Sequence, residues 1–93
     1  MIARRLHIQG RVQGVFYRQW TVNTATELGL QGWVRNRSDG TVEAQVQGDE
    51  AAVESFIEAA RHGPPMAEVT RLEVVAADLE AADAFRKLST LQV

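Results

Sequence analysis

Near the middle of the chain, residues 32–47 read GWVRNRSDGTVEAQVQ. Two stretches suited to β-strands meet at the Ser-Asp-Gly turn of residues 38–40, and Asp-Gly between such stretches is among the strongest short-range signals of a hairpin. In the second stretch Val42, Ala44 and Val46 alternate with polar residues. This alternation predicts one buried and one wet face, as in an antiparallel sheet covered on a single side. The polar residues of the predicted wet face are Thr41, Glu43, Gln45 and Gln47.

A helix is predicted on each side of this hairpin. Upstream, the spacing of apolar residues predicts a helix from Arg18 to Leu28, and Gly29 is a suitable terminator. Downstream, Asp49 can cap a second helix, which the Gly-Pro-Pro of residues 63–65 stops. The apolar residues that recur at helical spacing are Val22, Ala25 and Leu28 in the first helix and Val53, Phe56, Ile57 and Ala60 in the second.

Outer strands are predicted beyond the two helices. Ile2, Leu6 and Ile8 lie at even positions with a polar residue between the last two, although Arg4 breaks the apolar side, and Gly10 is expected to end that run. Residues 69–76 are rich in β-branched side chains, and Leu72 and Val74 are the expected core positions.

The remaining C-terminal part completes the topology. Residues 77–83 are interpreted as a loop and residues 84–90 as a short edge strand. The resulting order is βαββαβ plus a terminal strand. Two right-handed crossovers joined by a hairpin predict an α+β, ferredoxin-like split βαβ sandwich: an antiparallel sheet with both helices on one face. Residues 1–93 are expected to form one domain, since a chain of this length has no room for a second core.

The composition excludes several classes of protein. The chain has no cysteine, so neither a disulfide framework nor a thiolate metal site is available. No stretch approaches the roughly 18 apolar residues of a membrane span, and the N-terminus lacks the apolar run of a signal peptide. We therefore expect a cytoplasmic protein with no membrane partner. Because no large exposed apolar stripe argues for a dimer, we also expect a monomer.

Basic residues are concentrated in the N-terminal part. Residues 1–37 carry six arginines and one acidic residue, whereas residues 38–93 carry four basic and eleven acidic residues, for a net charge of −2. This asymmetry predicts a local anion site rather than a general polyanion binder. The alternative is that these arginines are solvated charges on strands and loops.

The first candidate site is the loop GRVQGVFYR, residues 10–18. Its glycines allow successive backbone N–H groups to converge, and the start of the following helix adds partial positive charge. Arg18, in the first helical turn, supplies a planar fork that can bind two phosphate oxygens. The loop fits neither a nucleotide P-loop nor the G-x-G-x-x-G pattern. The alternative is a strand-to-helix connection whose glycines only make turns.

The second candidate is Asn36, near the end of the strand predicted for residues 32–37. In the predicted fold this strand can lie close to the start of the first helix, so the Asn36 amide can face the loop and hold a water in line with a phosphorus atom. The alternative is a turn residue before the hairpin. His7 and His62 lie on different predicted elements, so we expect no shared catalytic or metal role for them, and no metal or cofactor.

The residue types that are missing from this set point to a substrate class. Displacing an alkoxide from a phosphate ester normally needs a general acid or a metal, and neither accompanies the loop. An acyl phosphate instead releases a carboxylate, whose conjugate acid has a pKa of about 4, so that proton is unnecessary. A site limited to positioning and electrostatic stabilisation therefore favours acyl phosphates as substrates.

A non-catalytic phosphate- or nucleic-acid-binding module is the alternative function. Phe16, Tyr17, Trp20 and Trp33 lie among the N-terminal arginines, but RNA-recognition sheets carry aromatics on two central strands, and residues 41–47 contain none. A regulatory domain that binds a small molecule is the other non-enzymatic option for this fold. We expect no nucleic-acid partner.

Two motifs resemble the signatures of the acylphosphatase family: GRVQGVFYR at residues 10–18 and GWVRNRSDGTVE at residues 32–43. The similarity extends in order to Gly48, Phe56 and the Gly-Pro at residues 63–64, so it covers essentially the whole chain. A chain limited to this domain resembles the free-standing enzymes rather than the longer hydrogenase-maturation proteins that carry a similar domain at their N-terminus.

The resemblance implies a cofactor-free enzyme that hydrolyses acyl phosphates to a carboxylate and inorganic phosphate. By this similarity Arg18 binds the phosphate, Asn36 holds the attacking water, and Gly10 and Thr41 orient Asn36. The loop whose backbone amides help to bind the phosphate comprises Val12, Gln13, Gly14, Val15, Phe16, Tyr17 and Arg18.

Overall fold

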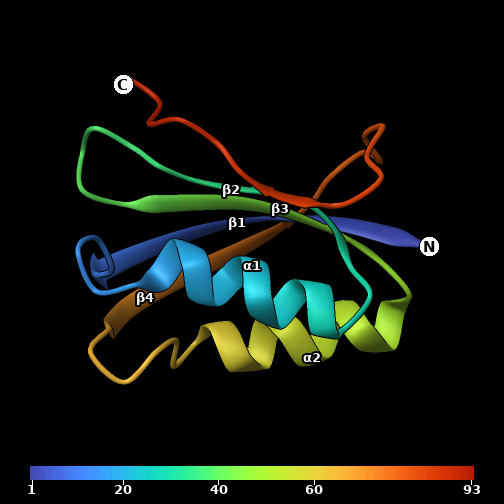
Figure 1. Cartoon of the computed structure of the whole chain (residues 1–93), viewed down its shortest axis with the longest axis horizontal. Coiled ribbons are helices and arrows are strands. Elements are labelled where there is room, and N and C mark those ends of the chain that lie inside the picture. The colour runs from blue at the N-terminus through green and yellow to red at the C-terminus, as the bar shows by residue number, and fades with distance from the viewer.

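Two helices lie against one face of a five-stranded sheet in the computed structural model, which describes all of residues 1–93 (Figure 1). The elements are β1 (Ile2–Arg11), α1 (Tyr17–Glu27), β2 (Gln31–Asn36), β3 (Val42–Gly48), α2 (Glu50–Ala60), β4 (Glu68–Ala76) and β5 (Phe85–Lys87). The strand order is β4-β1-β3-β2-β5, and every neighbouring pair is antiparallel except β2 and β5. The predicted ferredoxin-like arrangement is confirmed, with the added finding that the edge strand β5 pairs in parallel.

The hairpin of β2 and β3 forms as predicted. Its register pairs Gly32 with Val46 and Asn36 with Val42, and the Arg37 N–H donates to the Thr41 carbonyl oxygen at 2.9 Å across the turn. This register makes Asn36 the last residue of β2. The hairpin therefore presents Asn36 at the end of the sheet where β1 leads into α1.

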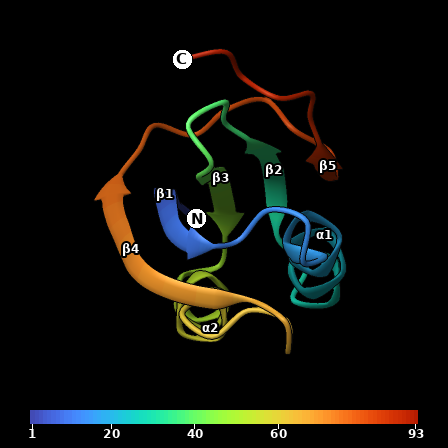
Figure 2. The same cartoon turned by 90° about the vertical axis from the view of Figure 1, so that its left-hand side faces the viewer.

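The core lies between the inner face of the sheet and the two helices. The predicted inward residues of β3 are all fully buried, as are the Val53, Phe56 and Ala60 side chains of α2. Asp49 is the N-cap residue of α2 as predicted, although its side chain makes no capping hydrogen bond. In the end view of Figure 2, β4 curves around α2, which closes that side of the core. Neither α1 nor α2, with 11 residues each, meets the length and hydropathy of a membrane-spanning helix.

The buried face of α1 differs from the prediction. Tyr17, Thr21 and Ala25 are buried, whereas Val22 and Leu28 only pack at the border of the core. The helix begins with Tyr17, whose ring is buried and whose hydroxyl donates to a carbonyl oxygen of α2. Because residues four apart share a helix face, the other interior positions follow from Tyr17 at steps of four.

β1 continues past Gly10, contrary to the prediction. The strand runs to Arg11, and its pairing with β4 shifts register between Gln9 and Gly10. Gly10 has φ of 120°, and a Cβ atom there would lie 2.2 Å from the Glu68 carbonyl oxygen. Glycine therefore permits a local irregularity that bends the end of the strand while β4 remains paired with it.

The outer face of β3 is not wet, contrary to the prediction. Gln45 and Gln47 are 0% and 2% exposed, because residues 77–84, here called the crossing segment, pass over them between β4 and β5. The Gln45 amide donates to the Asp78 carbonyl oxygen at 2.9 Å. The Gln47 amide donates to the Glu80 carbonyl oxygen at 2.6 Å and accepts from the Glu80 N–H at 3.0 Å. The segment has no regular structure, as predicted, and it satisfies two buried amides.

Candidate active site

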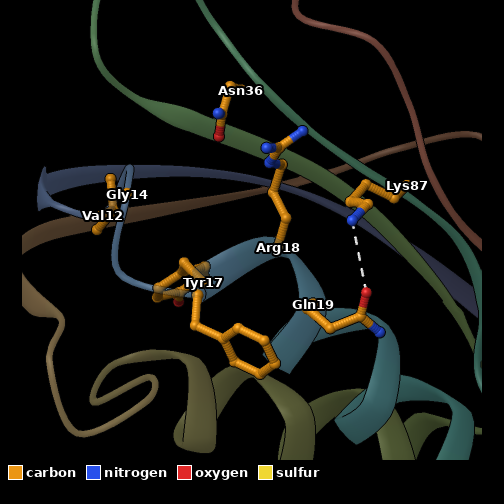
Figure 3. A pocket seen from close by; sticks show the side chains of 8 residues that line it. Val12, Gly14, Tyr17, Arg18, Gln19, Asn36 and Lys87 are labelled. Carbon is orange, nitrogen blue, oxygen red and sulfur yellow. Dashed lines mark hydrogen bonds between the residues drawn. The ribbon is translucent and has the colours of Figure 1, made fainter.

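A pocket of about 220 Å³ opens where the start of α1 faces the end of β2 (Figure 3). Its lining residues are Val12, Gly14, Phe16, Tyr17, Arg18, Gln19, Asn36 and Lys87. The pocket brings together Arg18 and Asn36, which lie 18 positions apart in the sequence. In Figure 3 the Arg18 side chain rises from α1 towards the sheet, and the Asn36 amide points from the end of β2 towards the loop.

In the loop between β1 and α1, the backbone φ angle alternates in sign from residue to residue. Gly14 and Phe16 both have φ of 73°, whereas Val15 between them has a negative φ. Such alternation turns successive N–H groups to one side and creates an anion-binding concavity. Phe16 is the only non-glycine residue of the chain with a positive φ, a conformation that costs on the order of 1 kcal/mol or more. The strained residue lines the pocket, which indicates that this backbone conformation serves a ligand.

The Arg18 guanidinium has no acidic partner. The ion pairs of the chain involve other cations, and no aspartate or glutamate lines the pocket. Arg18 lies in the first turn of α1, where unpaired backbone N–H groups and the helix dipole add positive potential. An unpaired guanidinium beside converging N–H groups favours binding of a phosphate group.

The Asn36 side chain carries a buried acceptor without a partner. Its Oδ1 atom is inaccessible from outside and accepts no hydrogen bond within the protein. The backbone of Asn36 is held firmly, because its carbonyl oxygen accepts from the Leu91 N–H at 2.9 Å and its strand pairs with Val42. A side-chain amide of a pocket-lining residue that makes no hydrogen bond within the protein is suited to hold a bound water.

Gln13 joins the loop to the hairpin that carries Asn36. Its Nε2 atom donates to the Arg37 carbonyl oxygen and to the Thr41 carbonyl oxygen, both at 2.8 Å. A side-chain amide has two N–H groups, so both are used. Sequence analysis assigned Gln13 only a backbone role, and the structure adds this side-chain clamp, which sets the position of the hairpin relative to the loop.

The predicted supporting residues Gly10 and Thr41 make no hydrogen bond to the Asn36 side chain. Gly10 pairs with Val69 in the sheet. The Thr41 hydroxyl donates to Asp39 Oδ1 at 2.6 Å and accepts from His7 Nε2 at 2.9 Å, because a carboxylate can only accept. The hydrogen bonds from Thr41, with a smaller contribution from the nearby Arg37 charge, lower the pKa of the Asp39 carboxyl and keep it ionised. Thr41 therefore stabilises the hairpin turn beside Asn36.

Tyr17 fixes the end of the loop to the second helix. Its hydroxyl donates to the Ala60 carbonyl oxygen at 2.6 Å, and burial raises the pKa of Tyr17 well above its ordinary value. The ring is 1% exposed, so Tyr17 takes part in the pocket wall without offering its hydroxyl to a ligand.

Sequence analysis missed two pocket residues, Gln19 and Lys87. Lys87 Nζ lies 3.5 Å from Gln19 Oε1 across the pocket rim (Figure 3). The signal for Lys87 was its spacing from Phe85: residues two apart in a strand share a face, and Phe85 is buried against the helices. The pairing of β5 with β2 was needed to place that face beside Asn36.

Two of the aromatic residues among the N-terminal arginines, Trp20 and Trp33, lie in different environments. Trp20 packs against Tyr17 and Phe56, with ring centroids 5.5 and 6.1 Å apart. Trp33 lies outside the pocket, with the Arg5 and Arg35 guanidinium groups 4.9 and 4.6 Å from its ring. No three His, Cys, Asp or Glu side chains gather in a group that could hold a metal ion, and His7 and His62 lie on different segments.

Known acylphosphatases are similar to this chain over most of its length. The family model described as Acylphosphatase matches residues 4–87. An acylphosphatase of Acidiphilium cryptum is 51% identical over 90 residues, which cover 97% of this chain and 99% of the relative. An acylphosphatase of Rhodospirillum rubrum is 62% identical over 69 residues, which cover 74% of this chain and 76% of the relative.

Solved structures extend the likeness to three dimensions. The acylphosphatase from Bacillus subtilis superposes with a TM-score of 0.91 at 39% identity, over 95% of this chain and 99% of the other. Full-length HypF in its phosphate- and nucleotide-bound form gives a TM-score of 0.91 at 28% identity, over 98% of this chain but 12% of the other. With the pattern of residues 10–18 and 32–43, the fold and the pocket all in agreement, the chain belongs to the acylphosphatase family.

Proposed function

We propose that residues 1–93 act as one acylphosphatase domain that hydrolyses the carboxyl-phosphate bond of acyl phosphates. The observation that carries this proposal is the meeting, in one pocket, of an unpaired guanidinium, a concave loop and a buried amide oxygen without a partner. The family described as Acylphosphatase, to which the chain belongs, supports the reaction class.

Arg18 and the loop hold the phosphoryl group. The guanidinium fork can donate to two phosphate oxygens, and the backbone N–H groups of residues 12–18 are proposed to donate to the others. These donors are already in place before the substrate binds, so they stabilise the charge on the transferred phosphoryl group without rearranging.

Asn36 holds the attacking water. Its side-chain amide, which belongs to a pocket-lining residue and has no partner in the protein, holds the water by a hydrogen bond and directs the water oxygen at phosphorus. A bond forms between the water oxygen and phosphorus while the bond from phosphorus to the acyl oxygen breaks. The bonding pair leaves with the carboxylate. Both water protons stay with the phosphate, the more basic product, which forms as H2PO4− and then exchanges a proton with the solvent according to pH.

The pocket suits a leaving group that needs no proton. Its lining contains no carboxylic acid and no histidine that could act as a general acid. A carboxylate leaves unprotonated at neutral pH, whereas an alkoxide does not. This chemistry supports a metal-independent reaction on small acyl phosphates. A monomeric state and a cytoplasmic location stay predictions from the sequence, which sedimentation of the purified protein and cell fractionation test.

Hydrolysis of benzoyl phosphate in the presence of EDTA tests the proposal. The wild-type protein is expected to release benzoate and inorganic phosphate, and Asn36→Asp, which keeps the size of the side chain, is expected to be much slower because its charge repels the phosphate. Gln92→Glu, at an exposed position outside the pocket, adds the same charge as a control. A folded wild-type protein that binds phosphate but leaves benzoyl phosphate intact would favour the binding-module alternative.

A further inference from the structure

Lys87 is the exposed last residue of β5, two positions after the buried Phe85. Phe85 and Lys87 share the face of the strand that looks towards the helices, and Phe85 is 7% exposed. At Lys87 that face borders the pocket instead of the core, and the side chain lines it. Figure 3 shows the ammonium group directed at Gln19, on the far side of Arg18 from Asn36.

The charge of Lys87 is not neutralised by the protein. Six of the ten basic residues lie within 4.0 Å of a carboxylate: Arg5, Arg35, Arg37, Arg61, Arg71 and Arg86. Of the remaining four, Arg18 and Lys87 both line the pocket, and no acidic residue does. The pocket of a protein with net charge −2 therefore holds two cations and no anion.

Lys87 and Asn36 lie at different ends of the pocket. Lys87 pairs with Val34, two residues before Asn36 on the neighbouring strand. This diagonal corresponds to about 8 Å between the Cα atoms of Lys87 and Asn36. Gln19 orients the lysine: its Oε1 faces Lys87 Nζ at 3.5 Å, while its Nε2 donates to Asn23 Oδ1 at 3.0 Å. The proposed phosphate site between Arg18 and the loop thus has a second cation beside it, on the side of Arg18 away from Asn36.

We propose that Lys87, positioned by Gln19, forms a second anion subsite, which selects acyl phosphates whose acyl part carries another negative group, such as a carboxylate. The proposal rests on the proposed function, because the phosphoryl group must occupy the loop. One phosphate is served by Arg18 and the backbone N–H groups, so the ammonium group is available to the acyl side. In such a substrate, the spacer between the phosphoryl group and the second negative group must be long enough for that group to reach Lys87.

Binding of phosphonates that cannot be hydrolysed tests this subsite independently of turnover. Titration calorimetry would compare methylphosphonate with carboxyalkyl phosphonates that have one, two or three methylene groups between the two acids. The wild-type protein is expected to bind the best-fitting carboxyalkyl phosphonate about fivefold more tightly than methylphosphonate, the ratio typical of one partly exposed ion pair. Lys87→Met is expected to remove that preference and to leave methylphosphonate binding within about twofold.

Arg86→Met is the matched control. This variant removes the same charge from the neighbouring position of β5. The Arg86 side chain faces away from the pocket and pairs with Asp83. This variant and Lys87→Arg should both retain the preference. Equal weakening of both ligand types by Lys87→Met, or no preference in the wild type at any spacer length, would overturn the subsite. Failure of benzoyl phosphate hydrolysis would instead refute the proposed enzyme, since the phosphonate comparison needs no turnover.

Discussion

Basic side chains on the two sides of the sheet lie in opposite environments. On the outer face, Arg35 donates to Glu43 at 2.9 Å and stacks over Trp33, and Arg5 lies within 4.0 Å of both Glu43 and Glu80. On the inner face, at the pocket, Arg18 has no carboxylate within reach. The two environments use the same side-chain chemistry. The outer arginines are satisfied by the protein, and the inner one is left for a ligand.

The contrast explains why the N-terminal excess of arginines predicted an anion site but did not identify which arginine belongs to it. Arg5, Arg35 and Arg37 contribute to that excess, yet they pair with Glu43, Glu80 or Asp39 and stabilise the sheet surface. A binding site is indicated by a cation whose partner is missing. That property depends on the positions of the acids in space, which charge counts along the chain do not show.

The largest expected difference in kcat/KM is between a variant that lacks the unpaired Arg18 and one that lacks the paired Arg35. Arg18→Met should lower kcat/KM for benzoyl phosphate by about 10²-fold or more, as for the loss of a preorganised donor to a developing charge. Arg35→Met should leave kcat/KM within about twofold and lower the free energy of unfolding by about 1 kcal/mol. Steady-state kinetics and urea unfolding check the pair. Comparable kinetic losses in both variants would remove the distinction between the two faces.

The Gln13 clamp is expected to have the next largest effect. Gln13→Glu replaces two N–H donors by a carboxylate that faces the Arg37 and Thr41 carbonyl oxygens. We expect kcat to fall about tenfold with a smaller change in KM, and the free energy of unfolding to fall by about 2 kcal/mol. Gln92→Glu is the control for added charge. A loss of stability without any change in kcat would make Gln13 a structural residue only.

Tyr17 links the pocket wall to α2, and its effect should depend on pH. Its folded-state pKa is raised above the unfolded value, so the stabilisation is fully present below about pH 10 and is lost as the pH rises further. We expect unfolding free energies measured between pH 8 and pH 11 to fall above about pH 10, by up to about 1.4 kcal/mol per unit. Tyr17→Phe should lose about 1 kcal/mol at neutral pH and abolish this contribution. Because the chain has one tyrosine, its absorbance titration gives an independent check.

The smallest expected effect belongs to the outer face. Glu80→Gln removes the charge that pairs with Arg5 while an oxygen remains to accept from Trp33 Nε1. Since the pair is partly exposed, the free energy of unfolding should change by less than about 1 kcal/mol, with kcat/KM unaltered. Chemical unfolding and kinetics of the same sample measure both quantities. A clear fall in kcat/KM would show that the crossing segment influences the pocket.

Elements with strong periodicity or turn chemistry were predictable from the sequence. The Asp-Gly hairpin and the helix with Val53 and Phe56 are where local patterns place them. The loop before α1 is shorter than predicted, since β1 runs to Arg11 and α1 begins at Tyr17. The buried face of α1 was not predictable from the sequence, because it is set by the contact of Tyr17 with α2. The burial of Gln45 and Gln47 was also hidden, since the segment that covers them comes from over 30 positions away.

The pocket residues that belong to local sequence motifs were predictable, and those brought in by tertiary pairing were not. Arg18 and Asn36 belong to contiguous motifs, so the chemistry of a loop and a strand end suggested both. Lys87 enters the pocket only because the short strand β5 pairs in parallel with β2. Leu91 holds the Asn36 carbonyl oxygen from a C-terminal segment whose sequence has no regular pattern. Contacts of this kind follow from tertiary pairing rather than from local spacing.

The division of labour between Arg18 and Asn36 is tested most directly by phosphate affinity in Asn36→Ala. Calorimetric titration of inorganic phosphate would be run on the wild type, Arg18→Ala and Asn36→Ala, with benzoyl phosphate turnover measured alongside. We predict that Asn36→Ala binds phosphate within about twofold of the wild type while kcat falls by about 10²-fold, and that Arg18→Ala loses binding. Equal loss of phosphate affinity in both variants would contradict a water-holding role for Asn36.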